Sequence, residues 1–477
     1  MPRMPGPPTR PRPAVGVIAL GCPKNLVDTE VMLGLLRQAG FALVPDPDQA
    51  GVLLVNTCCF IEPARREAAE ALAEAVRWRR AGEARALICA GCWPEMEAPA
   101  LRAQFPEIDA YMGPGDVANV VSVVTRALAR AGPQQPQSPP AAHLHDDHSP
   151  RLRTTAPWTA YLKIADGCSH HCRFCVIPRL RGPYRSRPLD SIIAEARQMA
   201  AEGVREINLV AQDTTGYGRD TKETDLPDLL AGLAAIDDLH WIRVLYAFPT
   251  GVTDRLIQVM ASNDRVCHYL DLPFQHADRD ILRVMGRPGD GGAYLKLIAR
   301  LRAAMPDIAL RSSFIVGFPG EGEAEFQRLL DFIQAADLDR AGAFCYSPER
   351  DTPAAELPDR PPADVAQERY HRFMLAQQAV SLARNERWIG RTLEVLLESP
   401  GEEPGEWIGR SFRDAPAVDG TVTVHSGALP LRPGVFIQAQ VVGAEPYDLI
   451  AETPGGGRPS RRLTTTSRLS RGRGRRR

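Results

Sequence analysis

Three cysteines, Cys168, Cys172 and Cys175, form a C-x3-C-x2-C pattern within the stretch DGCSHHCRFC (166–175). Thiolates are the protein ligands of iron–sulfur clusters, and a closed four-iron cubane takes four of them. A set of three therefore suits a cubane whose fourth iron has no protein ligand. An open metal position is typical of a catalytic site rather than a structural one, as it is for zinc. The spacing thus predicts a reactive cluster.

A zinc site is the alternative for the same stretch, because C-x2-C pairs are common in zinc modules. His170 or His171 would then supply the fourth ligand. A motif alone does not decide between the two metals. The strand and helix pattern of 159–348 favours the cluster, because it predicts a catalytic barrel whose mouth would hold the motif.

A second set of cysteines follows predicted strands near the start of the chain. Predicted strands and helices alternate there, at 15–20, about 26–39, 52–55, 64–80 and 86–90. This alternation predicts a parallel sheet with helices on both faces, whose strands end at one edge where ligands collect. Cys22, Cys58 and Cys92 each come just after one of the strands. We expect these thiolates to converge on a second cluster with a free iron, and three buried, unligated cysteines are the alternative.

Further cysteines compete for these roles. Cys89 lies inside a predicted strand, where a free cysteine is usually a small core residue. Cys59 directly follows Cys58, and two adjacent residues cannot easily both face one cluster. We therefore expect Cys58 to be the ligand. Cys267 and Cys345 lie within later predicted strands and are expected to be core residues.

Residues 154–388 are expected to form a partial (β/α)6 barrel. Candidate strands lie at 159–164, 205–211, 241–247, 267–272, 308–316 and 341–346, with amphipathic helices between them. Six units fall short of a full eight-stranded barrel, so the predicted barrel is open, with its active site at the carboxyl ends of the strands. The C-x3-C-x2-C loop follows the first strand and lies at that mouth. The lateral opening would suit a macromolecular substrate.

Residues 389–453 differ in character, because five short predicted strands alternate there with Gly and Pro turns. Such a pattern predicts a small β-barrel of the oligonucleotide-binding type. Up to Glu452 this part holds four basic and ten acidic residues, a net charge of −6. That charge repels phosphate and favours a basic protein partner.

The remaining parts are a linker and a tail. Residues 131–153 are rich in Pro and Gln, and we expect a solvated linker; a metal role for His143, His145 and His148 is the weaker alternative. Residues 454–477 contain nine arginines and no acidic residue, which predicts a disordered basic tail. Such a tail either attaches to nucleic acid or is a solvated extension without a role.

The bulk composition excludes several classes of protein. The chain has 477 residues, of which 24% are charged, an ordinary globular composition. It contains no apolar run of the ~18 residues that a membrane helix needs, and its Pro-rich start lacks the apolar centre of a signal peptide. We therefore expect a cytoplasmic protein with no membrane partner. Ten cysteines in a reducing compartment indicate metal binding or catalysis rather than disulfides.

Seven stretches resemble the radical S-adenosylmethionine (radical SAM) methylthiotransferases, and among them the ribosomal-protein aspartate methylthiotransferase (RimO) family. They are GCPKNLVDTE (21–30), VNTCCFI (55–61), the cysteines of 166–175, VAQDTTGYG (210–218), LDLPFQHADRDILRVMGRPG (270–289), SSFIVGFPGE (312–321) and YSPERDTPAA (346–355). The resemblance implies a methylthiotransferase domain at 14–130, a radical SAM domain at 154–388 and a TRAM domain at 389–453. The family pattern also selects Cys58 and Cys92, although it has glycine where this chain has Cys59, so the choice between the adjacent cysteines stays open.

The resemblance implies two [4Fe–4S] clusters and S-adenosyl-L-methionine (SAM) as cofactors. Cys168, Cys172 and Cys175 would hold the cluster at which one electron cleaves SAM to a 5′-deoxyadenosyl radical. That radical would take hydrogen from the β-carbon of an aspartate in the decoding-centre protein of the small ribosomal subunit, a carbon that acid–base chemistry does not activate. A second SAM would supply the methyl group, and the amino-terminal cluster would hold the sulfur. The ribosomal protein, an electron donor and a sulfur source are the implied partners.

Other polar residues are expected at the mouth of the predicted barrel, near the C-x3-C-x2-C loop. Gln212 and Asp213, Gln275 and His276, and the turn 317–320 all follow predicted strands, where backbone groups could hold the adenine and ribose of SAM. Each could equally be a structural cap or turn. The basic run 179–187 either holds substrate or forms a solvated loop.

Two other functions compete with aspartate methylthiolation. The first is methylthiolation of an adenosine in transfer RNA, which would use the same two clusters. The acidic barrel, Pro-Lys-Asn at 23–25 and Gln-Asp-Thr at 212–214 favour the protein substrate, whereas the basic tail favours RNA. The second is a non-catalytic RNA-binding protein with a structural metal.

Overall fold

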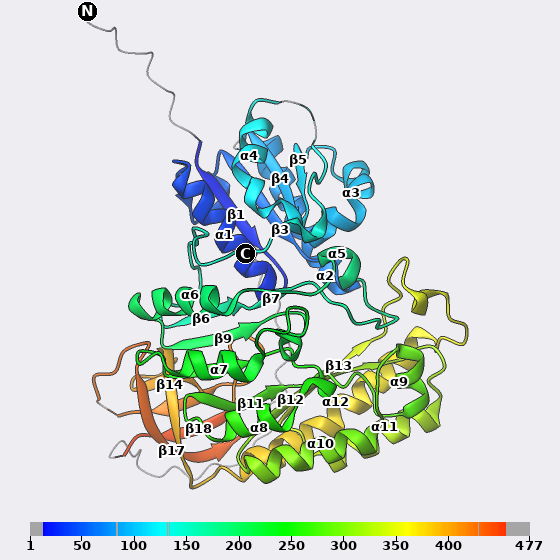
Figure 1. The fold of residues 1–477 in the computed structure, drawn as a ribbon, viewed down its shortest axis with the longest axis vertical. Coiled ribbons are helices and arrows are strands. Elements are labelled where there is room, and N and C mark those ends of the chain that lie inside the picture. Colours follow the sequence, from blue (N-terminus) through cyan, green and yellow to red (C-terminus); the bar gives the residue numbers. More distant parts are fainter. Residues whose placement is uncertain (1–12, 83, 131, 133, 428, 455–477) are drawn as a thin grey trace, which may run out of the picture. The chain divides into compact units, whose positions relative to one another are not determined.

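The computed structural model describes residues 13–82, 84–130, 132, 134–427 and 429–454 (Figure 1). The chain divides between Ser381 and Leu382 into two compact units. Among the described residues, no helix is both long enough and apolar enough to span a bilayer. From residue 455 onward, the expected basic tail lies outside the described residues.

The first unit begins with a parallel sheet of five strands in the order β2-β1-β3-β4-β5. The strands are β1 Val15–Ala19, β2 Leu43–Val44, β3 Val52–Thr57, β4 Ala86–Gly91 and β5 Ala110–Met112. The helices are α1 Pro23–Gln38, α2 Glu62–Arg80, α3 Cys92–Gln104 and α4 Val120–Leu128.

Both faces of this sheet are covered, as its unbroken apolar strands require. Leu53 and Val55 of β3 pack with residues of α2 and α3, whereas Val52 and Leu54 pack with residues of α1 and α4. Successive side chains of a strand point to opposite faces, so one strand contributes to both cores. The predicted parallel α/β domain is confirmed.

A second parallel sheet in the same unit has six strands in the order β13-β12-β11-β10-β9-β6 and does not close (Figure 1). The strands are β6 Thr159–Lys163, β9 Glu206–Val210, β10 Trp241–Val244, β11 Val266–Asp271, β12 Ala309–Val316 and β13 Arg340–Cys345. The short strands β7 Ala165–Asp166 and β8 Arg185–Ser186 form a separate pair. The predicted open barrel is confirmed.

Helices follow the strands of this second sheet, and four of them begin at polar side-chain caps. The helices are α6 Leu189–Ala201, α7 Leu226–Ala234, α8 Asp254–Ala261, α9 Arg279–Met285, α10 Gly291–Ala304, α11 Glu323–Ala336 and α12 Ala363–Glu386. The short helix α5 Ile177–Arg181 instead packs with the core of the first sheet. Asp225, Thr253, Asp278 and Asp290 each accept a hydrogen bond from a first-turn amide of the following helix. These bonds satisfy amides that a helix start otherwise leaves without a partner.

The segment between the two sheets is packed rather than solvated. The Gln134 carbonyl accepts a hydrogen bond from the Tyr111 amide beside β5. Arg151 donates to Glu30 of α1 and to Glu195 of α6. His145 is only 2% exposed. The expectation of a solvated linker is wrong for this histidine, because buried charged groups surround it; the predicted boundaries at 131 and 153 stay a prediction.

The second unit contains a closed five-stranded barrel in the order β14-β15-β16-β18-β17. The strands are β14 Thr392–Pro400, β15 Glu406–Ser411, β16 Val422–His425, β17 Phe436–Ala444 and β18 Leu449–Glu452. Alternate residues such as Leu393, Val395 and Leu397 fill its interior. The predicted small β-barrel is confirmed.

Candidate active site

Cys22, Cys58 and Cys92 follow three strands that are neighbours in the first sheet. Their strands stand side by side in the order β1-β3-β4, and all three are parallel. Cys22 is the N-cap residue of α1, and Cys92 is the first residue of α3. The parallel pairing therefore places all three cysteines at one edge of the sheet.

Glycines allow the three cysteine loops to approach one another closely. A Cβ atom on Gly21 would lie 2.6 Å from the Cβ of Cys58, and one on Gly91 would lie 2.4 Å from the carbonyl oxygen of Thr57. Both glycines also have positive φ, 90° and 98°. Side chains other than hydrogen would therefore separate these loops or strain their backbone.

The three thiols influence one another electrostatically. Burial raises the pKa of Cys58 to about 12, and the neighbouring Cys92 and Cys22 add to the shift. Burial also raises the pKa of Cys92, although Arg181 opposes the shift. For Cys22, burial favours the thiol, but the charges of Lys24 and Arg181 outweigh it and lower the pKa. The structure therefore brings these three cysteines together and surrounds them with positive charge.

The competing cysteines have core positions. Cys59 is fully buried, and its sulfur lies 4.0 Å from the sulfur of Met96. Cys89 is fully buried in β4, with its sulfur 3.9 Å from the Thr57 hydroxyl. Cys58, by contrast, is partly exposed. These surroundings favour Cys58 over Cys59 as a ligand, and that assignment stays a prediction.

The two later cysteines differ from each other. Cys267 is 3% exposed and belongs to the core, as expected. Cys345 is only partly buried, and its thiol lies 3.5 Å from the carbonyl oxygen of Ala366. Cys345 is thus a strand residue at the margin of the core rather than within it.

Cys168, Cys172 and Cys175 lie in the loop between β7 and α5. Burial raises the pKa of Cys168 to about 11 and that of Cys175 to about 12, with Cys172 contributing to both shifts. The Cys168 amide donates to the Gly182 carbonyl across 3.1 Å, which fixes one end of the loop. The Arg287 guanidinium lies 3.8 Å from the sulfur of Cys172. The loop therefore presents three neighbouring thiols with a cation beside them.

The histidines of this loop have other surroundings. His170 Nε2 lies 2.7 Å from Asp213, and its ring stacks on Phe248 at 3.8 Å between centroids. His171 is exposed. Across the described part of the chain, no group of three or more His, Cys, Asp or Glu side chains is arranged to hold a metal ion. The contacts of His170 with Asp213 and Phe248 therefore disfavour this histidine as a zinc ligand.

Each trio of thiols instead suits a cubane cluster. A cubane spreads its cysteines over different irons, so the cysteines need not converge on one point as the ligands of a single ion do. The thiols of each trio lie close enough to shift one another's pKa, as ligands of one cluster would. The neighbouring cations also favour the thiolate form that iron requires.

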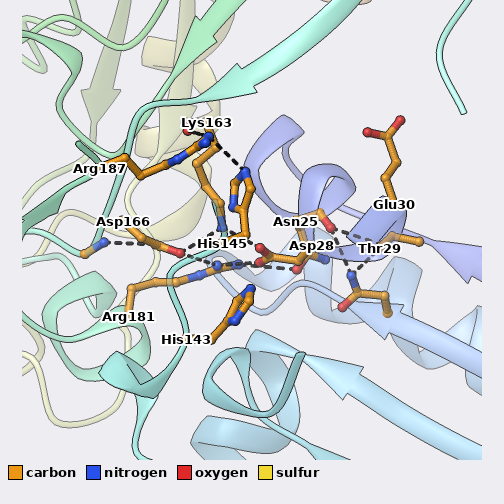
Figure 2. A network of polar contacts seen from close by, with 12 residues as sticks. Asn25, Asp28, Thr29, Glu30, His143, His145, Lys163, Asp166, Arg181 and Arg187 are labelled. Carbon is orange, nitrogen blue, oxygen red and sulfur yellow. Dashed lines mark hydrogen bonds and ion pairs between the residues drawn. The ribbon is translucent and has the colours of Figure 1, made fainter. Parts of the chain in front are cut away.

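Four buried charges join the amino-terminal sheet to the barrel, and Figure 2 shows them converging. Lys163 of β6 donates to Asp28 of α1 and, across 2.9 Å, to Asp166 of β7. Arg181 of α5 donates to Asp28 across 2.6 Å and to Asp166 across 3.3 Å. All four side chains are buried. Because the charges alternate, each buried group has opposite neighbours that offset its desolvation.

Two arginines of the basic run 179–187 are structural. Arg181 is 2% exposed and Arg187 is 1% exposed, and Arg187 pairs with Glu195. Both expectations for the run, a substrate grip and a solvated loop, are wrong for these two residues. Their burial was not predictable from neighbouring residues, because their acidic partners lie on other elements.

Polar residues expected at the mouth make hydrogen bonds within the protein. Gln212 donates to Asp166 across 3.0 Å, and Asp213 accepts from the Gly216 amide across 3.0 Å. Glu321 accepts from the Gly317 amide across 2.9 Å and lies 3.2 Å from His276. These bonds are what structural caps require, whereas contacts with SAM stay a prediction.

Sequence reasoning gave no individual role to Lys24. Its side chain is buried, and its ammonium nitrogen lies 3.1 Å from the centroid of the Tyr246 ring. Tyr246 follows β10 and has a φ of 60°, which is unusual for a bulky residue. A lysine that follows Cys22 in α1 thus reaches the mouth of the barrel.

Three family models match the chain. They are the radical SAM superfamily at residues 162–333, the uncharacterized protein family UPF0004 at 14–113 and the TRAM domain at 389–453. Among solved structures, the fold is similar to the radical SAM methyltransferase TsrM from Kitasatospora setae, with a TM-score of 0.52 and 15% identity. That match covers 72% of this chain and 73% of TsrM and concerns the fold alone.

Much closer relatives share the name ribosomal protein uS12 methylthiotransferase RimO. The relative from Desulforamulus reducens is 46% identical over 442 residues, which cover 92% of this chain and 99% of the relative. The relative from Moorella thermoacetica is 48% identical over 417 residues, covering 87% and 94%.

These similarities confirm the resemblance inferred from the sequence. The protein is a radical SAM enzyme, and SAM and [4Fe–4S] clusters are its cofactors. A non-catalytic RNA-binding protein with a structural metal is therefore not supported. The chain belongs to the ribosomal protein uS12 methylthiotransferase RimO family.

Proposed function

We propose that this enzyme adds a methylthio group to the β-carbon of an aspartate in uS12, the decoding-centre protein of the small ribosomal subunit. The observation that carries the proposal is the similarity, at 46% identity over 92% of the chain, to a relative named for this substrate. Within the first unit, one cysteine trio follows strands of the five-stranded parallel sheet, and the other follows β6 and β7 at the start of the barrel.

The two trios have separate roles in this proposal. Cys168, Cys172 and Cys175 hold the cluster that binds SAM, and Cys22, Cys58 and Cys92 hold the cluster that carries sulfur. When bound, the first cluster supplies the electron that splits SAM, and the second supplies the sulfur that reaches carbon. An electron donor and a sulfur source are required as partners.

The surrounding side chains maintain the charge balance of both sites. Arg287 beside Cys172, and Arg181 beside Cys92, stabilise thiolates that burial would otherwise disfavour. The paired charges of Asp28, Lys163 and Asp166 hold the two cysteine-bearing segments in register without leaving a buried charge uncompensated. These ion pairs connect α1, which follows Cys22, to β7, which precedes Cys168.

Methylthiolation of a transfer RNA adenosine is the competing substrate assignment. The charge of the TRAM barrel favours the protein substrate, because Arg410 and Arg413 are buried and cannot meet phosphate. Arg410 is also neutralised by Glu398 across 2.8 Å. An acidic surface favours a basic ribosomal protein over RNA.

Mass spectrometry of ribosomes from a strain that lacks the gene tests the assignment. The proposal expects uS12 to lose a modification of about 46 Da, the mass that one methylthio group adds when it replaces hydrogen. The wild-type gene should restore the mark, and a Cys168→Ala gene should not. Loss of a methylthio mark from transfer RNA, with uS12 unchanged, would overturn the proposal.

A further inference from the structure

Lys24 is a buried lysine with no hydrogen-bonded carboxylate among the described residues, and the negative charge that acts on it most strongly is that of the Cys22 thiolate. Its side chain is 7% exposed, and among the described residues it has a ring contact with Tyr246 but no hydrogen-bonded acceptor. The other buried lysine of this region, Lys163, donates to both Asp28 and Asp166. A buried ammonium costs free energy unless an opposite charge compensates it. The contrast indicates that the Lys24 ammonium, besides its electrostatic interaction with Cys22, can accommodate a carboxylate from outside the chain.

The nearby carboxylate does not fill this role. Asp271, which ends β11, accepts from Arg311 across 2.9 Å and from the Tyr246 amide across 3.2 Å. Its negative charge is therefore already compensated by Arg311. The ammonium of Lys24 remains available to a second carboxylate.

Lys24 lies where a substrate side chain could reach it. It is two residues after Cys22 of one trio, and its ammonium contacts the ring of Tyr246 near the carboxyl end of barrel strand β10. Tyr246 and Gln275, which follow β10 and β11, have φ angles of 60° and 73°. Strained backbone at non-glycine residues persists only where the surroundings enforce it, and it concentrates at functional sites.

We propose that the Lys24 ammonium binds the side-chain carboxylate of the substrate aspartate and thereby selects aspartate over asparagine. This inference rests on the function proposed above. The carboxylate carbon of aspartate is bonded directly to the β-carbon, so an ion pair at the carboxylate also fixes the reacting carbon. A lysine is suited to this task because its ammonium forms charge-assisted hydrogen bonds with carboxylate oxygens.

The test compares two peptides and four proteins. The peptides carry the target loop of uS12, one with the aspartate and one with asparagine in its place. The proteins are the reconstituted holoenzyme and its Lys24→Met, Lys24→Arg and Lys296→Met variants. Lys296 is an exposed lysine on α10 and serves as the matched control. Binding is measured with SAM but without reductant, so that no turnover occurs, and iron content is measured on every sample.

Wild type and Lys296→Met should bind the aspartate peptide about 10- to 100-fold more tightly than the asparagine peptide, as expected for a charge-assisted hydrogen bond. Lys24→Met should bind both peptides equally, and Lys24→Arg should keep part of the preference. A variant that weakens both peptides by the same factor would overturn the proposal, because Lys24 would then act only on the fold or the cluster.

If the proposed function is wrong, the same measurements give a different result. Wild-type enzyme that binds neither peptide and modifies neither would overturn the function and this inference with it. Wild-type enzyme that modifies the aspartate peptide but binds the two peptides equally would overturn the role of Lys24 alone. This last comparison uses only the wild-type enzyme, so it tests the role of Lys24 even if the Lys24→Met variant holds less iron.

Discussion

The guanidinium of Arg181 lies 3.7 Å from the sulfur of Cys92, and the same side chain donates to Asp28 and Asp166. Arg181 ends α5, the helix that follows Cys175 of the SAM-binding loop. Cys92 begins α3 in the amino-terminal domain. One buried arginine therefore connects the chain segment of one cysteine trio to a member of the other.

Replacing Arg181 by methionine should destabilise the protein by about 3–5 kcal/mol, the usual effect of breaking a buried ion pair. Asp28 and Asp166 would then share Lys163 as their buried cation. Urea unfolding of the metal-free protein measures the change. Arg255→Met is the control, because Arg255 pairs with Asp225 and Asp228 at the exposed surface. An exposed ion pair contributes only about 1 kcal/mol or less to the free energy of unfolding. Equal effects of the two substitutions would contradict the structural role of Arg181.

Substitutions in the two cysteine trios should separate two activities. Cys168→Ala should abolish SAM cleavage, because its trio holds the SAM-binding cluster. Cys22→Ala should still permit SAM cleavage but stop sulfur insertion. The readouts are 5′-deoxyadenosine and methylthiolated peptide, and Cys267→Ala is the control because Cys267 is a buried core residue. Full methylthiolation by Cys22→Ala would remove the second trio from the account.

The adjacent cysteines of the second trio should differ in iron content. Cys58→Ala should lower iron by about one cubane, or four irons per chain. Cys59→Ala should retain the iron and instead lose stability by about 1 kcal/mol, because it opens a small cavity in the core. Iron analysis and urea unfolding measure the two effects. The opposite pattern would make Cys59 the ligand.

The stability of the protein should fall as the pH decreases below about 6.5. Burial lowers the pKa of His145 from 6.5 to about 4, although Glu195 opposes the shift and Arg187 reinforces it. Between these two values the unfolded chain binds the proton and the folded chain does not, so acid favours unfolding. This contribution to stability is present above about pH 6.5 and is lost as the pH falls toward about 4.

His145→Gln should flatten this dependence between about pH 7 and 5.5, because glutamine does not titrate. Urea midpoints at several pH values provide the measurement. His148, which is exposed, supplies the control His148→Gln. Parallel pH profiles for wild type and His145→Gln would show that other groups cause the acid sensitivity.

The strands and their cysteines were predictable because the signals are local. An apolar run such as 52–55 identifies a buried strand by itself, and β3 indeed spans Val52–Thr57. Once strands alternate with helices, parallel pairing places the residues after β1, β3 and β4 at one edge. The short strands β2 and β5 were missed because two or three residues carry no periodic signal.

The buried charges were not predictable for the opposite reason. Lys163 and Asp28 are separated by 135 positions, and nothing near either residue in the sequence indicates the pair. Composition likewise predicted that 131–153 would be solvated, yet His145 is buried against Arg187 and Glu195. Opposite charges find each other only in the assembled fold. In the sequence, a charged residue that will be buried in an ion pair therefore looks the same as an exposed one.

We expect the enzyme to hold two cubanes on two separate trios of cysteines. Iron and sulfide analysis of the anaerobically reconstituted protein tests it directly, with Mössbauer spectra to identify the cluster type. Wild type should hold about eight irons per chain, and replacing either trio by alanine should leave about four. A wild-type protein with a single cubane, or full iron retention after the loss of Cys22, Cys58 and Cys92, would contradict the claim.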